Sequence, residues 1–351
     1  YETGDGVGKN EAKAVELYRK ATEQGYAEAQ YMMGECYYYG TGIACDEDEA
    51  TKWYRKAAEQ GFAQAQRTLG DCYYNGDGVE DNEAEAVKWY QKAAEQNHAE
   101  AQYMLGECYY YGRGIDENEA EAVKWYQKAA EQGDAEAQYS LGNCYCYGIG
   151  VEKDFTKTVE WCQKAAEQGN AKAQRDLACY YMYGKGVEKN VQKAVDLYRK
   201  AAEQGDAEAQ YDLGRCYDYG EGVEKNSAKA VEWYRKSAGN GNTSAQFMLG
   251  VCYEYGQSVT LSKAIAAEWY RKAADQGYAT AQYRLGVFYE NGYGVTQNKE
   301  EAAKWYKKAA DQGDEDAKKA LDRMQSSGMG TAVAAGVAAA GVGILWKFLN
   351  S

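Results

Sequence analysis

The chain of 351 residues contains no proline, a single histidine and fewer basic than acidic residues. Runs of valine, isoleucine and threonine are also missing, so the composition does not favour β-sheet and fits a helical protein whose turns contain glycine. The formal net charge of -14 argues against a nucleic-acid partner, because neutralising phosphates requires a basic surface. With one histidine, the chain also lacks the side chains that zinc sites commonly combine with cysteine.

What the chain does contain is a strict repeat of 36 residues. The segment Ala29-Gln30-Tyr31 has equivalents at every 36-residue step up to Ala281-Gln282-Tyr283, with no insertion between them. Eight full units therefore occupy residues 27–313, and a partial unit occupies residues 1–26. A fixed period of this length is typical of a solenoid, in which each unit buries its apolar face against the next.

Each unit is predicted to form two helices. In the first helix, Ala29, Met33 and Cys36 follow the i, i+4, i+7 spacing of one buried helical face. The second helix of each unit carries a similar apolar stripe. Gly34 and its equivalents lie inside the first helix, where glycine costs about 1 kcal/mol relative to alanine. We therefore expect a neighbouring helix to approach closely at this glycine.

Capping residues mark the ends of these helices. The first helix is predicted to end at a glycine in the left-handed conformation, as at Gly40. The second helix is predicted to begin after a residue whose side chain can accept hydrogen bonds from free helix amides. Nine equivalent residues have this property, namely Asn10, Asp46, Asn82, Asn118, Asp154, Asn190, Asn226, Ser262 and Asn298. The sequence thus predicts an all-α fold.

The pattern AxAQYxLGxCYxxGxGVxxNxxxAxxWYxKAAEQG resembles that of the Sel-one-like repeat (SLR) family, which is related to the tetratricopeptide repeats. The resemblance covers residues 1 to about 324. It implies a right-handed superhelical solenoid of 36-residue helix-turn-helix repeats, an α/α superhelix. It also implies an adaptor or scaffold for protein complexes, as in membrane-protein quality control, signalling or host–pathogen contact. A fold alone does not identify the partner.

The two ends of the chain depart from the repeat. Tyr1 aligns with Tyr37 inside a first helix and no Met precedes it, so we expect a fragment of a longer protein whose N-terminal signal cannot be assessed. Residues 314–324 are predicted to form a terminal capping helix. A linker and a hydrophobic tail follow over residues 325–351.

The tail suggests a membrane anchor. Residues 329–346 carry no charge and would span about 27 Å as a helix, against a hydrocarbon core of about 30 Å. Ala332, Gly336 and Ala340 form a small-xxx-small ridge suited to helix pairing, and hence to oligomers, in lipid. The basic residues before the tail favour repeats on the cytoplasmic face of a membrane bound through residues 329–349. The alternative is a docked or unstructured tail, because alanine and glycine are only weakly hydrophobic.

Cysteine, histidine and acidic residues do not suggest catalysis. Equivalent positions of stacked repeats should be about 10 Å apart, whereas a disulfide needs Cα atoms within about 7 Å. We therefore expect the six cysteines that share one core position to be free thiols in a reducing compartment, namely Cys36, Cys72, Cys108, Cys144, Cys216 and Cys252. His98 occupies a helix-cap position, and the acidic residues recur in identical environments, unlike catalytic carboxylates. We expect no enzyme activity, no metal and no cofactor.

Two positions of the first helix change along the array, and their residues are the candidate partner-binding residues. Each position is named by its number in the first full unit, so position 35 means Glu35 and its equivalents. Position 38 is first aromatic and then acidic, at Tyr38, Tyr74, Tyr110, Asp218, Glu254 and Glu290. Position 35 is first acidic and then basic or apolar, with Glu35, Asp71, Glu107 and Arg215. Position 37, by contrast, is tyrosine in all eight units and is expected to belong to the core.

Positions 35 and 38 both lie off the predicted buried stripe, and in related solenoids the first helices line the concave surface. We therefore expect a groove that binds an extended peptide or a helix, with tyrosine supplying contact area at little entropic cost. Neutral drift on a solvated face is the alternative. The leading hypothesis is a cytosol-facing scaffold or adaptor for protein–protein interaction. The alternative is a lumenal or secreted interaction protein, which the sequon Asn242-Thr243-Ser244 would fit.

Overall fold

The computed structural model describes residues 8–326, and these residues form eighteen α-helices without a strand. The chain divides into two compact units, Tyr1–Lys189 and Asn190–Ser351. The helices of the first unit are α1 (Glu11–Glu23), α2 (Ala27–Tyr39), α3 (Glu47–Glu59), α4 (Ala63–Asn75), α5 (Glu83–Glu95), α6 (Ala99–Tyr111), α7 (Glu119–Glu131), α8 (Ala135–Tyr147), α9 (Phe155–Glu167) and α10 (Ala171–Tyr183). Those of the second are α11 (Val191–Glu203), α12 (Ala207–Tyr219), α13 (Ser227–Gly239), α14 (Thr243–Tyr255), α15 (Lys263–Asp275), α16 (Ala279–Asn291), α17 (Lys299–Asp311) and α18 (Glu315–Met324).

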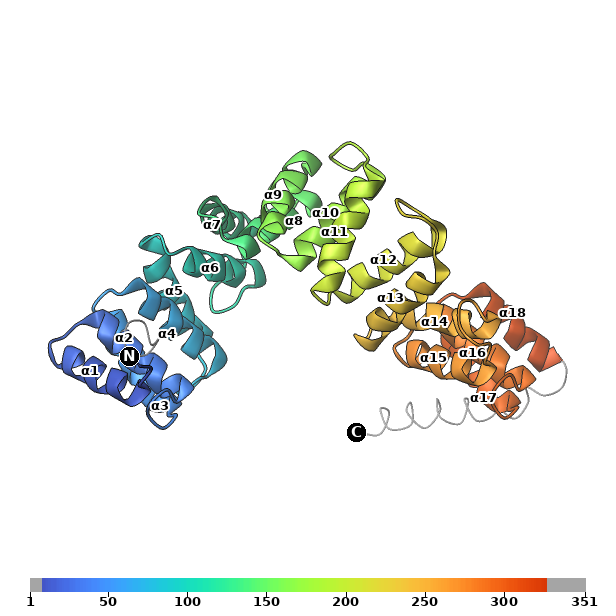
Figure 1. The fold of residues 1–351 in the computed structure, drawn as a ribbon, viewed down its shortest axis with the longest axis horizontal. Helices are drawn as coiled ribbons and strands as arrows, with labels where there is room; N and C mark the ends of the chain where they lie inside the picture. The colour runs from blue at the N-terminus through green and yellow to red at the C-terminus, as the bar shows by residue number, and fades with distance from the viewer. Residues whose placement is uncertain (1–7, 327–351) are drawn as a thin grey trace, which may run out of the picture. The chain divides into compact units, whose positions relative to one another are not determined.

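The predicted fold class is confirmed. Within each of the two compact units, every helix packs against the next helix along the chain, as Figure 1 shows for the pairs α2–α3 and α12–α13. The even-numbered helices from α2 to α16 are the first helices of the repeats, and the odd-numbered helices are the second helices. The structure is an all-α superhelix of helix-turn-helix repeats.

The predicted caps are present at both ends of the helices. Asn82, for example, precedes α5 with an extended backbone, and its side chain accepts a hydrogen bond from the amide of Glu85. All nine residues predicted to cap the second helices do the same. First helices end at a left-handed glycine such as Gly40, with φ of 69°. Asn97, which replaces a glycine after α5, also adopts a positive φ, of 66°.

The glycine inside the first helix meets a buried tyrosine of the second. A Cβ atom added to Gly34 would lie 2.4 Å from the ring of Tyr54, closer than any carbon contact allows. Tyr54 is 1 % exposed, and five of its equivalents are among the largest fully buried side chains of residues 8–326, namely Tyr90, Tyr126, Tyr234, Tyr270 and Tyr306. The close approach expected from the sequence is confirmed, and the group that approaches is an aromatic ring.

In six of the first helices, a buried glutamine joins the helix to the two second helices beside it. Gln66 on α4 donates from Nε2 to the carbonyl of Ala58 on α3, at 3.0 Å. Its Oε1 accepts from Gln96, which caps the end of α5, at 2.7 Å. Because a buried amide without partners is costly, this arrangement holds the glutamine in one orientation. The pair of bonds recurs at Gln102, Gln138, Gln210, Gln246 and Gln282.

Position 37 requires a correction. Its tyrosines were expected in the core, but all except Tyr181 are only half-buried. They lie at the edge of the core, where Tyr37 and Tyr73 pack against it from the side. The hydroxyl of Tyr73 also accepts a hydrogen bond from Arg55, at 2.6 Å. A tyrosine at the rim can bury its ring and still satisfy its hydroxyl, which explains its constancy without full burial.

Helix α18, in the segment predicted to cap the array, buries Ala317, Ala320 and Met324 against α17. Among residues 8–326, none of the helices has the length and apolar character needed to cross a bilayer. Ala332, Gly336 and Ala340, and with them the predicted anchor over residues 329–349, lie outside the described residues.

Candidate partner-binding surface

The acidic residues at position 35 accept hydrogen bonds from the buried tyrosines of the second helices. The hydroxyl of Tyr54 on α3 donates to Oε1 of Glu35 on α2, at 2.7 Å. The same bond joins Tyr90 to Asp71 at 2.8 Å and Tyr126 to Glu107 at 2.5 Å. Burial raises the pKa of Asp71 and of Glu107, because the charged carboxylate loses hydration there and the protonated form is favoured.

In the second unit the same tyrosine hydroxyls donate to position 38 instead. Tyr270 on α15 donates to Oε2 of Glu254 on α14, at 2.5 Å. The other two pairs are Tyr306 with Glu290 at 2.7 Å and Tyr234 with Asp218 at 3.4 Å. Position 35 is then free to change, and Arg215 there forms an ion pair with Asp212 at 3.6 Å.

Positions 35 and 38 are therefore two alternative places for one acceptor. Variation at these positions was interpreted from the sequence as exposure away from the core, and that interpretation needs correction. Their side chains lie half-buried at its edge, and Tyr38, Tyr74 and Tyr110 pack against the core clusters of their repeats. Cys146 and Met182, which occupy position 38 between the tyrosines and the acids, are buried.

Strongly exposed tyrosines lie one position further along, at the last residue of six of the eight first helices, whereas α4 and α16 end at asparagine. Tyr39, Tyr111, Tyr147 and Tyr183 of the first unit are each between 54 % and 70 % exposed. Tyr219 and Tyr255 continue the pattern in the second unit. Position 39 is not among the binding residues predicted from the sequence, although its helical spacing marks it. It follows positions 32 and 35 at helical spacing, so it continues their half-buried stripe to the exposed end of the first helix.

A small cavity opens on this face between α6, α7 and α8. It has a volume of about 100 Å³, and the residues that matter in its lining are Glu107, Tyr110, Tyr111, Tyr126, Ser140 and Asn143. We call it the Glu107 notch. Three aromatic rings form its walls, and the Glu107 carboxylate is its acidic group. It thus brings together position 35, position 38 and the exposed position 39 of one repeat, along with two polar residues of the next.

Comparison with known proteins identifies the repeat. The model of the Sel1 repeat matches residues 1–26, 27–62, 63–98, 99–134, 135–170, 171–206, 207–242, 243–278 and 279–314. The chain belongs to the Sel1 repeat family. Each matched segment from 27–62 to 279–314 contains one first helix and the second helix that follows it.

Two solved structures with this repeat are similar over most of the chain. One is a protective antigen present in uropathogenic Escherichia coli strains, with an SLR fold, 41 % identity and a TM-score of 0.79. The match covers 86 % of this chain and 65 % of the antigen, so the chain spans less than two thirds of that relative. The other is a Sel1 repeat protein from Oxalobacter formigenes, with 35 % identity, a TM-score of 0.67 and coverage of 88 % and 89 %. No curated protein matches the chain.

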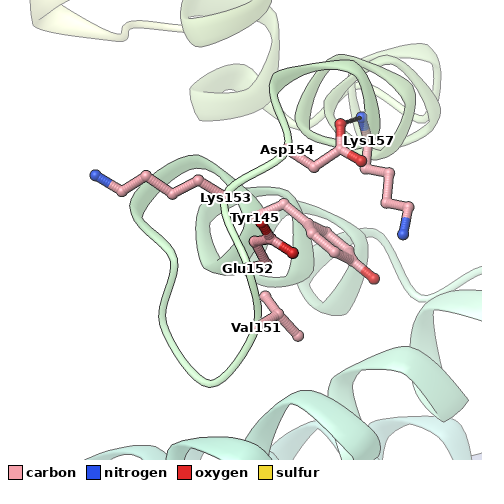
Figure 2. Close-up of a pocket in the computed structure, with 6 residues that line it drawn as sticks. All are labelled: Tyr145, Val151, Glu152, Lys153, Asp154 and Lys157. Atoms are coloured by element: carbon pink, nitrogen blue, oxygen red, sulfur yellow. Dashed lines mark hydrogen bonds between the residues drawn. The ribbon is translucent and has the colours of Figure 1, made fainter.

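The Sel1 repeats also have open depressions at the loops between their helices. The one in Figure 2 has a volume of about 460 Å³ and lies beside Tyr145 and the start of α9. Lys153 and Lys157 extend to opposite sides of it, and the Asp154 side chain caps the helix (Figure 2). Equivalent depressions beside Arg55 and Arg235 have different linings. Their polar groups do not converge on one point, and we assign no site to them.

Two residues singled out in the sequence have structural roles. His98 begins α6, where Nδ1 accepts from the amide of Ala101 and Nε2 faces Gln64 at 2.7 Å. Asn242 of the sequon is buried, and its Oδ1 accepts from the amide of Ala245 at 2.7 Å. A glycan on Asn242 would require this helix start to open, so the sequon lends no support to a lumenal location. Among residues 8–326, no group of histidine, cysteine and acidic residues is arranged to hold a metal.

Proposed function

We propose that the chain is a scaffold for protein–protein interaction that holds a peptide or a helix against the face formed by its first helices. The observation that carries the proposal is the row of exposed tyrosines at position 39. Large exposed aromatic residues that recur on one face are typical of protein-binding surfaces, because they supply contact area with little rotamer entropy to lose. The half-buried residues of positions 35 and 38 form the inner edge of the same face.

A display experiment with random peptides tests the proposal on the intact chain. The native protein is expected to enrich a set of peptides, and Tyr39→Ser, Tyr111→Ser, Tyr147→Ser and Tyr183→Ser together should abolish that enrichment. The matched control changes four exposed residues of the second helices, Glu59, Glu95, Glu131 and Glu167, to serine. Enrichment that survives the tyrosine changes, or that is lost equally in the control, overturns the assignment of the face.

The tyrosines of position 38 require a separate variant, because their rings also pack against the core. Tyr38→Ser, Tyr74→Ser and Tyr110→Ser together are expected to weaken peptide binding and to lower the unfolding midpoint as well. Circular dichroism on the same samples separates the two effects. Binding loss at a temperature where the helices remain intact assigns these rings to the surface, whereas loss that follows unfolding assigns them to packing.

We also propose, from the sequence of residues 329–349, that the tail tethers the scaffold to a membrane. The supporting feature is the uncharged run with its small-xxx-small spacing. Flotation of the full chain with lipid vesicles, next to a chain that ends at residue 326, provides the test. Equal flotation of both chains would remove the tether from the proposal and leave the scaffold unaffected.

A further inference from the structure

We infer that the Glu107 notch binds the cationic side chain of a partner segment, an arginine or a lysine, and thereby selects basic peptides. This inference rests on the proposed scaffold function, which it deepens by naming the chemistry of the partner. The notch lies on the same face as the exposed tyrosines, and Tyr111 belongs to both. A peptide that crosses the tyrosine row therefore passes over the opening.

The shape of the notch fits the head of one side chain. Its volume of about 100 Å³ is well below the roughly 300–1,000 Å³ of pockets for drug-sized ligands. The rings of Tyr110, Tyr111 and Tyr126 provide walls on which a cation is attracted to the aromatic face. Ser140 and Asn143 offer further hydrogen-bond acceptors for the N–H groups of a guanidinium or an ammonium.

The charge of the notch favours a cation. Glu107 accepts the hydroxyl hydrogen of Tyr126 through Oε1, and among residues 8–326 no cation lies within ion-pair distance of its carboxylate. Glu136 on α8 adds a second negative charge that acts on the same carboxylate, and the positive charge of Lys172 on α10 acts on it more weakly. A half-buried carboxylate in this setting gains more from a hydrogen-bonded cation than an exposed one does, because water screens it less.

The chain itself shows how such a site is filled. In the preceding repeat the equivalent carboxylate, Asp71, forms an ion pair with Arg67 at 3.0 Å, where Glu107 has Tyr103 at the corresponding position. In the last repeat Glu290 accepts two hydrogen bonds from Arg323, at 2.7 and 2.8 Å. Each of these carboxylates also accepts a buried tyrosine hydroxyl, as Glu107 does. Glu107 is thus the acceptor for which a partner would supply the arginine.

The test is an NMR titration of the full chain with N-acetyl-arginine amide and with its neutral counterpart, N-acetyl-citrulline amide. Arginine amide should shift the amide signals of Ser140 and Asn143 in a saturable manner, with at least fivefold higher affinity than citrulline amide. Glu107→Gln retains an acceptor for Tyr126 and removes the charge, so it should abolish that preference. Equal affinity for both amides, or an unchanged preference in Glu107→Gln, overturns the inference.

Two further variants use the neighbouring repeat as the control. Asp71→Asn changes a carboxylate that already has its own arginine and should leave the signals of Ser140 and Asn143 responding as in the native chain. Arg67→Tyr gives that repeat the pattern found beside Glu107 and should create a second site for arginine amide. If Asp71→Asn weakened arginine amide binding as much as Glu107→Gln does, the binding would depend on the net negative charge of the chain rather than on a specific site.

The display experiment separates failure of this inference from failure of the proposed function. Peptides enriched through the position 39 tyrosines but without a preference for arginine or lysine would contradict the inference and leave the scaffold standing. Saturable binding of arginine amide at the notch, with no peptide enriched, would contradict the scaffold and leave the cation site.

Discussion

The hydroxyl of Tyr180 on α10 donates a hydrogen bond to the sulfur of Cys146 on α8, at 3.4 Å. Tyr180 itself occupies the core position that is cysteine in six other repeats, and those cysteines lie next to a tyrosine of the preceding or following second helix, as Cys144 does beside Tyr126. At Cys162 and Tyr180 the large and small residues are exchanged, and Cys162 lies beside Gly142 where other repeats have the tyrosine ring. The exchange preserves volume within a densely packed interior.

This exchange predicts strong coupling between Cys162 and Tyr180. Tyr180→Cys should lower the free energy of unfolding by about 3 kcal/mol through the cavity it leaves. Cys162→Tyr alone should cost about 1–3 kcal/mol through overpacking. The double variant restores the arrangement of the other repeats and should recover most of the loss. Urea unfolding of the four proteins measures the coupling energy, and additive effects would show that the two residues do not share one space.

The glycine inside the first helix gives a second prediction on stability. Gly106→Ala would place a Cβ atom 2.6 Å from the ring of Tyr126, so we expect a net loss of about 1–2 kcal/mol despite the better helix propensity of alanine. Gly239 provides the control, because no atom lies within 4 Å of an added Cβ there. Gly239→Ala should stabilise the chain by about 0.5–1 kcal/mol. Stabilisation by both changes in thermal unfolding would mean that the tyrosine ring moves aside freely.

The raised pKa of Glu107 predicts how stability depends on pH. Burial is the main cause, Glu136 on α8 adds to it, and the hydroxyls of Tyr126 and Tyr103 and the charge of Lys172 oppose it. The folded chain therefore holds this proton to higher pH than the unfolded chain, so its contribution to stability is present at low pH and is lost as pH rises from about 4.5 through the raised pKa. Glu107→Gln should gain stability relative to the native chain over that interval.

Urea unfolding of both proteins across this pH range measures the difference. We expect less than about 1 kcal/mol, because the carboxylate is only partly buried and water screens its charge. Binding of arginine amide should weaken in the native chain as pH falls through the same raised pKa, since the cation needs the ionised carboxylate. A constant difference in stability between the proteins across the range would exclude a raised pKa at Glu107.

The cysteines predict selective thiol chemistry. Cys45 is exposed, whereas burial raises the pKa of Cys72 to about 11 and that of Cys108 to about 12. Because the thiolate is the reactive form, an aromatic disulfide reagent at pH 8 should modify Cys45 first and the buried thiols only as fast as the helices open. Cys45→Ser should remove the fast phase. A fast phase that persists in this variant would point to an opening of the core.

The parts of the fold that depend on short stretches of chain could be predicted from the sequence. Asn82 caps the start of α5 and Gly40 caps the end of α2 through contacts within a few residues, so both caps can be recognised directly from the sequence. The close approach at Gly34 could also be predicted, although the identity of the approaching ring could not. That identity depends on how two helices pack, which the spacing of apolar residues only limits.

The candidate surface could be predicted only in part. Tyr126 and Glu107 are 19 residues apart on different helices, and their hydrogen bond shows why position 35 is acidic in the first three full repeats, where position 38 is tyrosine. Variation of each position alone resembles the drift of a solvated surface. Comparing the two positions with each other reveals the compensation, and extending the half-buried stripe to Tyr39 would have located the aromatic row.

The paired bonds of Gln66 have a consequence for how this protein can change its length. The glutamine needs a carbonyl from the second helix before it and an amide from the second helix after it, and both are supplied by any neighbour with the same residues. Whole repeats can therefore be gained or lost at this junction without leaving a buried amide unsatisfied. Insertion of part of a repeat at the junction would leave a glutamine amide without one of its two partners. The length of an array that keeps these glutamine bonds therefore changes by one whole 36-residue repeat at a time.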